Sequence, residues 1–257
     1  MKTKIMAVIN QKGGVGKSTL AFHLAQAAAG DRDGKGKRVL CLDLDSQGNL
    51  SQYLTGDLDI INDINNGVGL LLEGKSFAAK QTTHPRIELL HGHGKLDQYD
   101  NDSDVEDRGY SAEMRHFLKS LGYDYIIIDT PPAVGFRHLA ALCWADVAVI
   151  PMEPVMTSIV GFQNVLAAIK EFILAINPGL KWCAVVNRAN MRVKSHREKE
   201  EMVREMYGNH VIATFATRTA VSDAMEEEPA QPVWQRKSAP KELREEWMKF
   251  CRKVISG

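Results

Sequence analysis

Short apolar segments alternate along this chain with longer segments whose apolar residues recur at helical spacing. The apolar segments lie at 4–9, 38–45, 86–91, 125–129, 145–151, 182–188 and 211–215. Segments this short and this uniformly apolar predict strands that are buried on both faces. Strands that alternate with helices predict an α/β fold, in which a mostly parallel, twisted sheet carries helices on both faces.

Three parts of the chain depart from this alternation. Residues 50–85 combine apolar residues with scattered glycines, which indicates short helices. The segment 97–109 is rich in acidic residues and poor in apolar ones, so we expect a mobile, solvated loop there. Residues 240–255 predict a C-terminal helix with one apolar stripe. Its three glutamates would oppose anionic lipid, so we expect it to pack on the body of the protein and not on a membrane.

The totals fit one domain that covers residues 1–257. The chain is 44% hydrophobic and 25% charged, and no apolar run is expected to reach the length of a membrane span. Its 32 basic side chains equal its 32 acidic ones, so contact with nucleic acid would need a local basic patch. The four cysteines show no C-x-x-C spacing, which favours core thiols in a reducing cytoplasm.

A glycine-rich loop lies between the strand predicted at 4–9 and the helix that begins near Leu20. Its phosphate-binding candidates are Gly13, Gly14, Val15, Gly16, Lys17, Ser18 and Thr19. Glycines let backbone N–H groups approach an anion closely, and the following helix brings its positive N-terminal end to the same place. In this pattern Lys17 reaches the β- and γ-phosphates, and the Ser18 hydroxyl ligates Mg²⁺. The loop therefore predicts a site for a nucleoside triphosphate.

Three aspartates end predicted strands. Asp43 and Asp45 end the strand at 38–45, and Asp129 ends the strand at 125–129. Because ligands of parallel sheets lie at the carboxyl ends of the strands, we expect these carboxylates beside the phosphates. Asp129 has the position of a carboxylate that holds Mg²⁺, directly or through water, and Asp43 faces the same region. The alternative for Asp43 and Asp45 is that they cap helices.

A second lysine distinguishes the loop. The usual phosphate loop has glycine where this chain has Gln11, whereas here Lys12 precedes the two glycines. The run Lys12–Thr19 resembles the deviant Walker A motif of the ParA/MinD family of ATPases, which includes the nitrogenase iron protein. Three further motifs are similar to those of the family and follow in its order: Asp45-Ser46-Gln47-Gly48-Asn49, Asp129-Thr130-Pro131-Pro132 and Asn187-Arg188.

The resemblance implies a P-loop NTPase fold with ATP and Mg²⁺ as cofactors. It implies that Lys12 crosses a dimer interface to the partner's nucleotide, that Lys17 binds phosphate, and that Asp45 orients the attacking water. A cation supplied across an interface stabilises charge that develops during phosphoryl transfer. Asn187 is placed against adenine, since an amide can both donate to and accept from a purine edge. The metal ligands implied are Ser18, Asp43 and Asp129.

The ParA branch is the most similar part of that family. This implies a weak ATPase whose ATP-bound homodimer binds DNA without sequence preference and therefore lies on the nucleoid, in the cytoplasm. A ParB-like or adaptor protein would stimulate hydrolysis and release the DNA, so that a plasmid, a chromosome or another cargo is segregated or positioned. DNA phosphates need Lys or Arg partners, for which the candidates are Arg192, Lys194, Arg197 and Arg218.

Three alternatives remain open at this point. A MinD-like ATPase that cycles on membranes would need the C-terminal helix to bind lipid. An iron–sulfur reductase like the nitrogenase iron protein would need cysteines in the loops beside the nucleotide, and none of the four has such a place. A regulator that binds nucleotide without significant turnover would keep the loop and lack hydrolysis.

Overall fold

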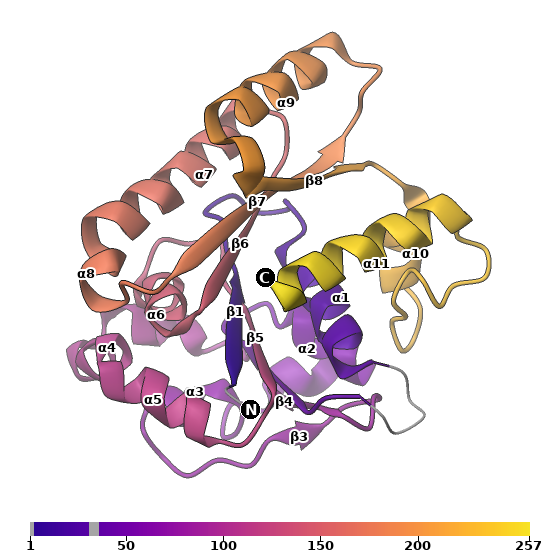
Figure 1. Cartoon of the computed structure of the whole chain (residues 1–257). Coiled ribbons are helices and arrows are strands. Elements are labelled where there is room, and N and C mark those ends of the chain that lie inside the picture. The colour runs from indigo at the N-terminus through magenta and orange to yellow at the C-terminus, as the bar shows by residue number, and fades with distance from the viewer. Residues whose placement is uncertain (1–2, 31–35) are drawn as a thin grey trace.

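The computed structural model describes residues 3–30 and 36–257. In this part of the chain, eight strands form one sheet in the order β3-β4-β2-β5-β1-β6-β7-β8 (Figure 1). All neighbouring strands are parallel except β3, which pairs antiparallel with β4 at one edge. The strands are β1 (Lys4–Val8), β2 (Val39–Asp43), β3 (Lys80–Gln81), β4 (Ile87–Leu90), β5 (Tyr125–Asp129), β6 (Val147–Met152), β7 (Lys181–Ala189) and β8 (Val211–Ala216). The expected α/β fold with a mostly parallel sheet is confirmed.

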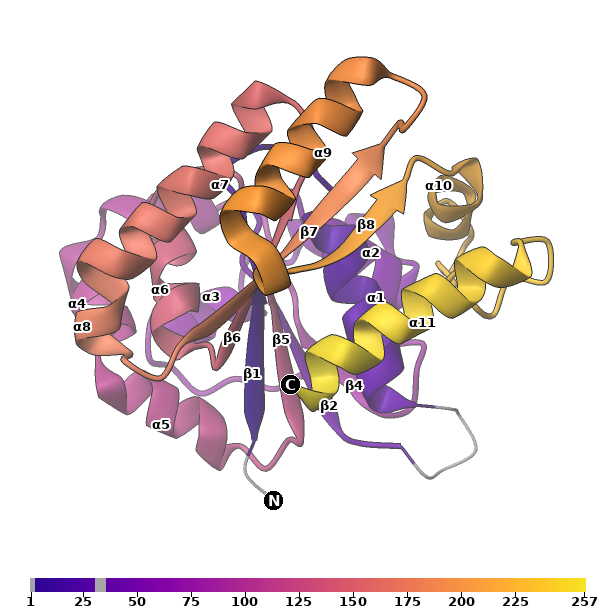
Figure 2. The same cartoon turned by 45° about the horizontal axis from the view of Figure 1, so that its top comes forward.

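Helices cover both faces of this sheet, as expected (Figure 2). Those on one face are α3 (Val68–Leu72), α4 (Ser103–Tyr110), α5 (Ala112–Ser120), α6 (Phe136–Trp144), α7 (Met156–Ala168) and α9 (Lys194–Tyr207). Those on the other face are α1 (Lys17–Ala29), α2 (Asn49–Thr55), α10 (Thr219–Met225) and α11 (Lys241–Ser256). The short helices expected within 50–85 are α2, α3 and a 3₁₀ turn at Leu58–Asn62. The two-residue strand β3 in the same stretch has no apolar run that would have predicted it.

Successive side chains of the central strands enter the two faces alternately, because a strand turns its side chains to opposite sides. In β1, Ile5 and Ala7 belong to one core cluster, and Met6 and Val8 belong to the other. The strand β5 lies between β1 and β2 in the sheet, and its register sets Asp129 opposite both Val8 and Asp43. The carboxyl ends of three strands therefore meet at one edge of the sheet, where the phosphate loop begins.

The C-terminal helix α11 packs on the body of the protein, as the sequence predicted. Trp247, Phe250 and Val254 are buried in the core cluster that also contains α1. The Trp247 ring stacks on Phe215 of β8, with ring centroids 4.5 Å apart. The Nζ of Lys4 donates to two carbonyl oxygens in the last turn of α11, where a cation complements the helix dipole. The apolar stripe of α11 is thus part of the core.

The expectation that no apolar run reaches the length of a membrane span is wrong for one helix. The continuous helix Met156–Ile176, made of α7, a π-helical turn and α8 (Leu174–Ile176), is long and apolar enough to cross a membrane by length and composition. One side of this helix packs on the sheet through Ile159, Phe162 and Val165, which belong to the core. A helix that covers a sheet in this way passes the same length and composition test, so the finding is weak evidence for a span.

The acidic segment 97–109 is not the solvated loop that its composition predicted. It contains a 3₁₀ helix, Leu96–Asn101, followed by α4. The Asp102 carboxylate caps α4 by accepting hydrogen bonds from two backbone N–H groups, and acidic residues in the first turn suit the helix dipole. Leu96, Tyr99 and Val105 are buried in the core. The few apolar residues thus anchor the segment, and the carboxylates of Asp97, Asp100 and Asp102 have partners within the protein.

A buried histidine joins α1 to the segment before α11. The Nδ1 of His23 lies 2.7 Å from the Thr19 carbonyl oxygen, and its Nε2 lies 3.1 Å from the backbone nitrogen of Val233. Because Nε2 accepts from a backbone N–H, the proton of the neutral ring is on Nδ1. The ring packs against Trp247, with centroids 4.3 Å apart. Burial lowers the pKa of His23 from 6.5 to about 4, so the ring is neutral at pH 7.

We predict that His23 makes the fold sensitive to mild acid. The unfolded chain takes up a proton near pH 6.5, which the folded chain resists until about pH 4. This contribution to stability is therefore complete above pH 6.5 and falls by about 3 kcal/mol as the pH drops to 4. Urea unfolding of the wild type and of His23→Asn should show a stability difference that narrows over this range. A difference independent of pH would contradict a buried neutral His23.

Candidate functional site

The phosphate loop is held in shape by an asparagine that lies two residues after the end of β1. The Nδ2 of Asn10 donates to the Pro151 carbonyl oxygen at 2.6 Å, and its Oδ1 accepts from the backbone N–H of Lys12 at 2.8 Å. Asn10 is fully buried. Its turn-forming chemistry is visible in the sequence, but its contact with β6 is not. We add it to the residues that build the site.

Close approach of other chain segments requires glycine at two places around this loop. Gly16, which precedes α1, has φ 93°, and a Cβ there would lie 2.5 Å from the Nδ2 of Asn187. On α7, a Cβ at Gly161 would lie 2.8 Å from the Oδ1 of Asn10. The loop therefore fits between the tip of β7 and the side of α7, and a side chain at either glycine would displace it.

Lys17 lies in the first turn of α1 and is buried despite its charge. Its Nζ donates to the Lys12 carbonyl oxygen at 3.2 Å, so the lysine reaches back across the loop. Burial lowers the pKa of Lys17, and the charges of Asp129 and Asp45 oppose this effect. A buried cation in the first turn of a helix, beside a glycine-rich loop, is suited to bind phosphate oxygens.

Asp129, at the end of β5, is the least satisfied carboxylate of the site. Its side chain is fully buried, and neither carboxylate oxygen has a hydrogen-bond partner within residues 3–30 and 36–257. Burial raises the pKa of Asp129 well above its usual value, and Asp43 raises it further, while the nearby Ser18 hydroxyl and Lys17 lower it. Buried polar atoms without partners require an explanation. A hard divalent cation held by Asp129 and Ser18 would supply one, so these two residues fit Mg²⁺.

Asp43 has hydrogen-bond partners of the kind that the helix-capping alternative predicts. Its Oδ2 accepts from the backbone N–H and the hydroxyl of Ser51, at 2.9 and 2.6 Å, and its Oδ1 accepts from the Asp45 N–H at 3.2 Å. Burial raises the pKa of Asp43 to about 7. Oδ2 thus binds the first turn of α2 and Oδ1 binds the turn that precedes the helix, which favours the helix-capping alternative over direct contact with a metal.

Asp45 lies between the phosphate loop and α2. Its Oδ1 accepts from the Gln47 N–H at 3.0 Å, which fixes the turn that leads into α2. Burial raises the pKa of Asp45, and the charges of Lys17 and Arg137 oppose this effect. The side chain lines the cavity above the phosphate loop. A carboxylate in this place can orient a water molecule toward a phosphate.

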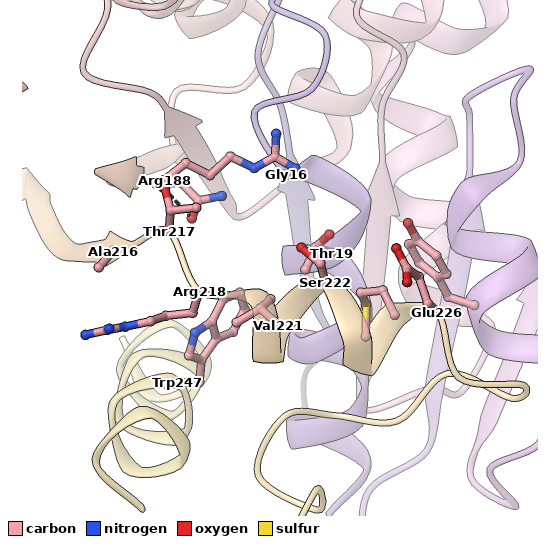
Figure 3. Close-up of a pocket in the computed structure, with 13 residues that line it drawn as sticks. Gly16, Thr19, Arg188, Ala216, Thr217, Arg218, Val221, Ser222, Glu226 and Trp247 are labelled. Carbon is pink, nitrogen blue, oxygen red and sulfur yellow. Dashed lines mark hydrogen bonds between the residues drawn. The ribbon is translucent and has the colours of Figure 1, made fainter. Parts of the chain in front are cut away.

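Two adjoining cavities extend from the loop. The first, of about 300 Å³, is lined by the phosphate loop together with Asp45 and Pro132. The second, of about 280 Å³, lies between Asn187, the start of α10 and Trp247 (Figure 3). Tyr53 and Arg188 line both cavities, and Figure 3 shows Arg188 extending toward Gly16. Phosphates in the first cavity would place a nucleoside in the second.

The structure places Asn187 at this second cavity and gives its amide two partners. The Nδ2 donates to the Val15 carbonyl oxygen at 2.8 Å, and the Oδ1 accepts from the Arg188 N–H at 3.0 Å. Asn187 thus holds the phosphate loop as well as lining the cavity. The aromatic ring of Tyr53 also lines it, and no motif in the sequence indicated this residue.

The remaining candidates divide between two places. Arg218 lines the second cavity, whereas Arg192, Lys194 and Arg197 are exposed together at the start of α9. In that group, Lys194 pairs with Glu198 and Arg197 donates to the Met191 carbonyl oxygen. The structure therefore keeps three of the four basic candidates in one patch and separates Arg218 from them.

Comparison with known proteins identifies the family. A family model described as an AAA domain matches residues 3–182. The chromosome-partitioning ATPase Soj of Thermus thermophilus is 31% identical, with 84% of this chain and 82% of Soj covered.

Two solved structures share the fold. McdA of Cyanothece, in a variant complexed with ATP, has a TM-score of 0.84 at 18% identity and covers 99% of this chain and 97% of its own. The septum site-determining protein MinD of Pyrococcus horikoshii, complexed with Mg-ADP, has a TM-score of 0.72 at 22% identity, covering 98% of this chain and 96% of its own. The matched domain, the Soj relative and this fold agree with the phosphate loop and its lysines, and the chain belongs to the ParA/MinD family of P-loop ATPases.

Proposed function

We propose that this protein is a ParA-like partition ATPase. Mg-ATP drives formation of a nucleotide-sandwich homodimer, the dimer binds DNA without sequence preference, and hydrolysis stimulated by a ParB-like or adaptor protein releases it. The observation that carries the proposal is the buried Asp129, whose oxygens have no partner in the described residues and whose pKa, raised by burial, is lowered in part by the charge of Lys17, a residue that lines the first cavity. Likeness to a chromosome-partitioning ATPase supports the use of the cycle for segregating or positioning a cargo.

Mg²⁺ fits the site through Asp129 and Ser18, and when bound it would neutralise charge on the β- and γ-phosphates. The chain's own groups do the remaining work. Lys17 binds the phosphates from within the subunit, and Asp45 orients the attacking water. The glycine N–H groups and the start of α1 stabilise negative charge on the phosphate oxygens.

Lys12 has the properties of a residue that acts on a second subunit. Its backbone is fixed within the loop at both ends, by Asn10 and by Lys17, while its side chain is exposed. A fixed backbone with a free cationic side chain suits contact across an interface. A lysine brought to the partner's γ-phosphate would stabilise the charge of the transition state.

A MinD-like membrane cycle is the alternative, and the position of α11 weighs against it. The apolar side chains of this helix are buried in the core, so lipid binding would require the helix to leave the sheet. Sedimentation of the full chain with anionic liposomes, in the presence of ATP or ADP, decides between the two. Iron–sulfur chemistry is disfavoured because all four cysteines are buried and none lies in the loops of the site.

The two lysines of the loop should have separable effects. Lys17→Ala removes the phosphate contact within the subunit and should weaken ATP binding by roughly 100-fold. Lys12→Ala should leave the Kd for ATP within a few-fold and reduce stimulated turnover by roughly 1,000-fold, as loss of a trans cation does. Fluorescent-nucleotide titration and phosphate release measure the two quantities. Wild-type turnover in Lys12→Ala would exclude the trans role.

Asp45→Ala should trap the ATP-bound dimer, because hydrolysis is the step that it removes. Size-exclusion chromatography with light scattering, with ATP, ADP or no nucleotide, should show a dimer only with ATP, and a longer-lived one in the variant. Each sample is run with and without non-specific DNA. Elution as a monomer with ATP in both proteins would contradict the sandwich dimer.

Binding to DNA should weaken steeply with salt, because phosphate contacts release counterions. Changing Arg192, Lys194 and Arg197 together to alanine should lower the slope of log Kd against log salt by about three. Lys80→Ala, on the opposite edge strand, is the matched control and should leave the slope unchanged. The assignment of this patch fails if the triple variant keeps the wild-type slope.

A further inference from the structure

Arg137 is a fully buried cation beneath the site. It lies in the first turn of α6, directly after the loop 130–135 that follows Asp129, and its exposure is 1%. All three of its nitrogen positions donate hydrogen bonds: Nε to Asp100, Nη1 to the Leu44 carbonyl oxygen, and Nη2 to both Asp97 and Asp100. One side chain therefore connects three segments that are distant in sequence.

The first connection reaches the residue before Asp45. The Nη1 of Arg137 donates to the Leu44 carbonyl oxygen at 2.8 Å, while the Leu44 N–H donates to the Asp129 carbonyl oxygen at 2.9 Å. Leu44, the residue before Asp45, is thus held at its N–H by β5 and at its carbonyl oxygen by Arg137. The direction in which the Asp45 side chain leaves the backbone depends on both bonds.

The second connection reaches the acidic segment. Asp100 accepts from the Arg137 backbone N–H at 3.1 Å and from its guanidinium at 3.1 and 2.7 Å, so it caps α6 and orients the arginine. The space above Asp100 exists because residue 135 is glycine, where a Cβ would lie 2.6 Å from the Asp100 Cγ. Asp97 adds an ion pair at 2.7 Å from the solvent side.

A buried ion pair of this kind adds little net stability, because removing the charges from water offsets their attraction. Its geometry, however, fixes the segments that it joins. Two of those segments are the loop that carries Asp45 and the loop that follows Asp129, and these line the phosphate cavity through Asp45 and Pro132. The guanidinium of Arg137 and the carboxylates of Asp97 and Asp100 lie beside these two loops, where net stability does not account for them.

We propose that Arg137 is a positioning residue for ATP hydrolysis. It fixes the position of the loop that carries Asp45 relative to the loop 130–135. Asp100 and Asp97 of the acidic segment orient it. The proposal rests on the proposed function for its kinetic consequence, but the structural part, fixation of the Asp45 loop by Arg137, does not need ATP.

The experiment uses Arg137→Leu, Arg137→Lys and Asp100→Asn in the full chain. We expect Arg137→Leu and Asp100→Asn to lower stimulated kcat at least tenfold while the Kd for Mg-ATP changes less than threefold. Arg137→Lys should recover part of kcat, because one ammonium can still reach the Leu44 carbonyl oxygen. A lower kcat with a nearly unchanged Kd indicates loss of an interaction that matters in the transition state, not loss of ATP binding.

Arg115→Leu is the matched control. Arg115 also donates to a backbone carbonyl, that of Trp144, and to an aspartate, Asp146, but these lie at the start of β6, at the end of the sheet away from the cavities. A general effect of losing a structural arginine would appear in this variant as strongly as in Arg137→Leu. We expect its kcat to stay within twofold of wild type.

Hydrogen exchange of the nucleotide-free proteins tests the structural part. Peptides covering residues 43–49 should exchange faster in Arg137→Leu and Asp100→Asn than in wild type or Arg115→Leu. If Arg137→Leu does not fold, the exchange and kcat of Asp100→Asn, which keeps the arginine, decide whether the proposal holds. Unchanged exchange and a kcat equal to that of the control overturn the proposal. A wild type without turnover refutes the proposed ATPase, and the exchange result still decides the role of Arg137.

Discussion

The structure depends on an electrostatic imbalance at the carboxyl edge of a parallel sheet. Three carboxylates, Asp43, Asp45 and Asp129, are buried there with one lysine of opposite charge, Lys17. Parallel strands create this arrangement, because the residues that end β2 and β5 come out at the same edge. Asp43 is satisfied by Ser51 and Asp45 by the turn before α2, but Asp129 is not satisfied by any described residue. The pKa of Asp129 is raised because a buried carboxylate without partners is costly to ionise, and a bound metal–nucleotide complex would remove this cost.

The sequence predicted the parts of the molecule that depend on short-range patterns. Apolar runs gave the parallel strands, and the glycines with Lys17 and Ser18 gave the phosphate loop, since each signal lies within about ten residues. Residues whose contacts lie far away in sequence were not predicted. Asn10 reaches a carbonyl in β6, and Tyr53 lines a cavity formed by four other segments. No local pattern contains either relation.

The acidic segment shows why composition misled. A run of acidic residues predicts a solvated loop when the sequence nearby contains no partner for the carboxylates. The partner of Asp97 and Asp100 is Arg137, which is buried and lies forty residues away in sequence from Asp97. Arg137 itself looks unremarkable in the sequence, at the start of an apolar helix. The ion pairs compensate the charge of each member, and together they join the loop that carries Asp45 to the loop 130–135.

The central claim is that Asp129 is left without a partner so that it can hold Mg²⁺ beside the phosphates. Calorimetric titration of ATP into the wild type and Asp129→Asn, each with Mg²⁺ or with EDTA, tests it most directly. The account predicts that Mg²⁺ tightens ATP binding at least tenfold in the wild type and that this gain disappears in the variant, where the residual affinity is the same with and without the metal. An equal gain from Mg²⁺ in both proteins would contradict the account.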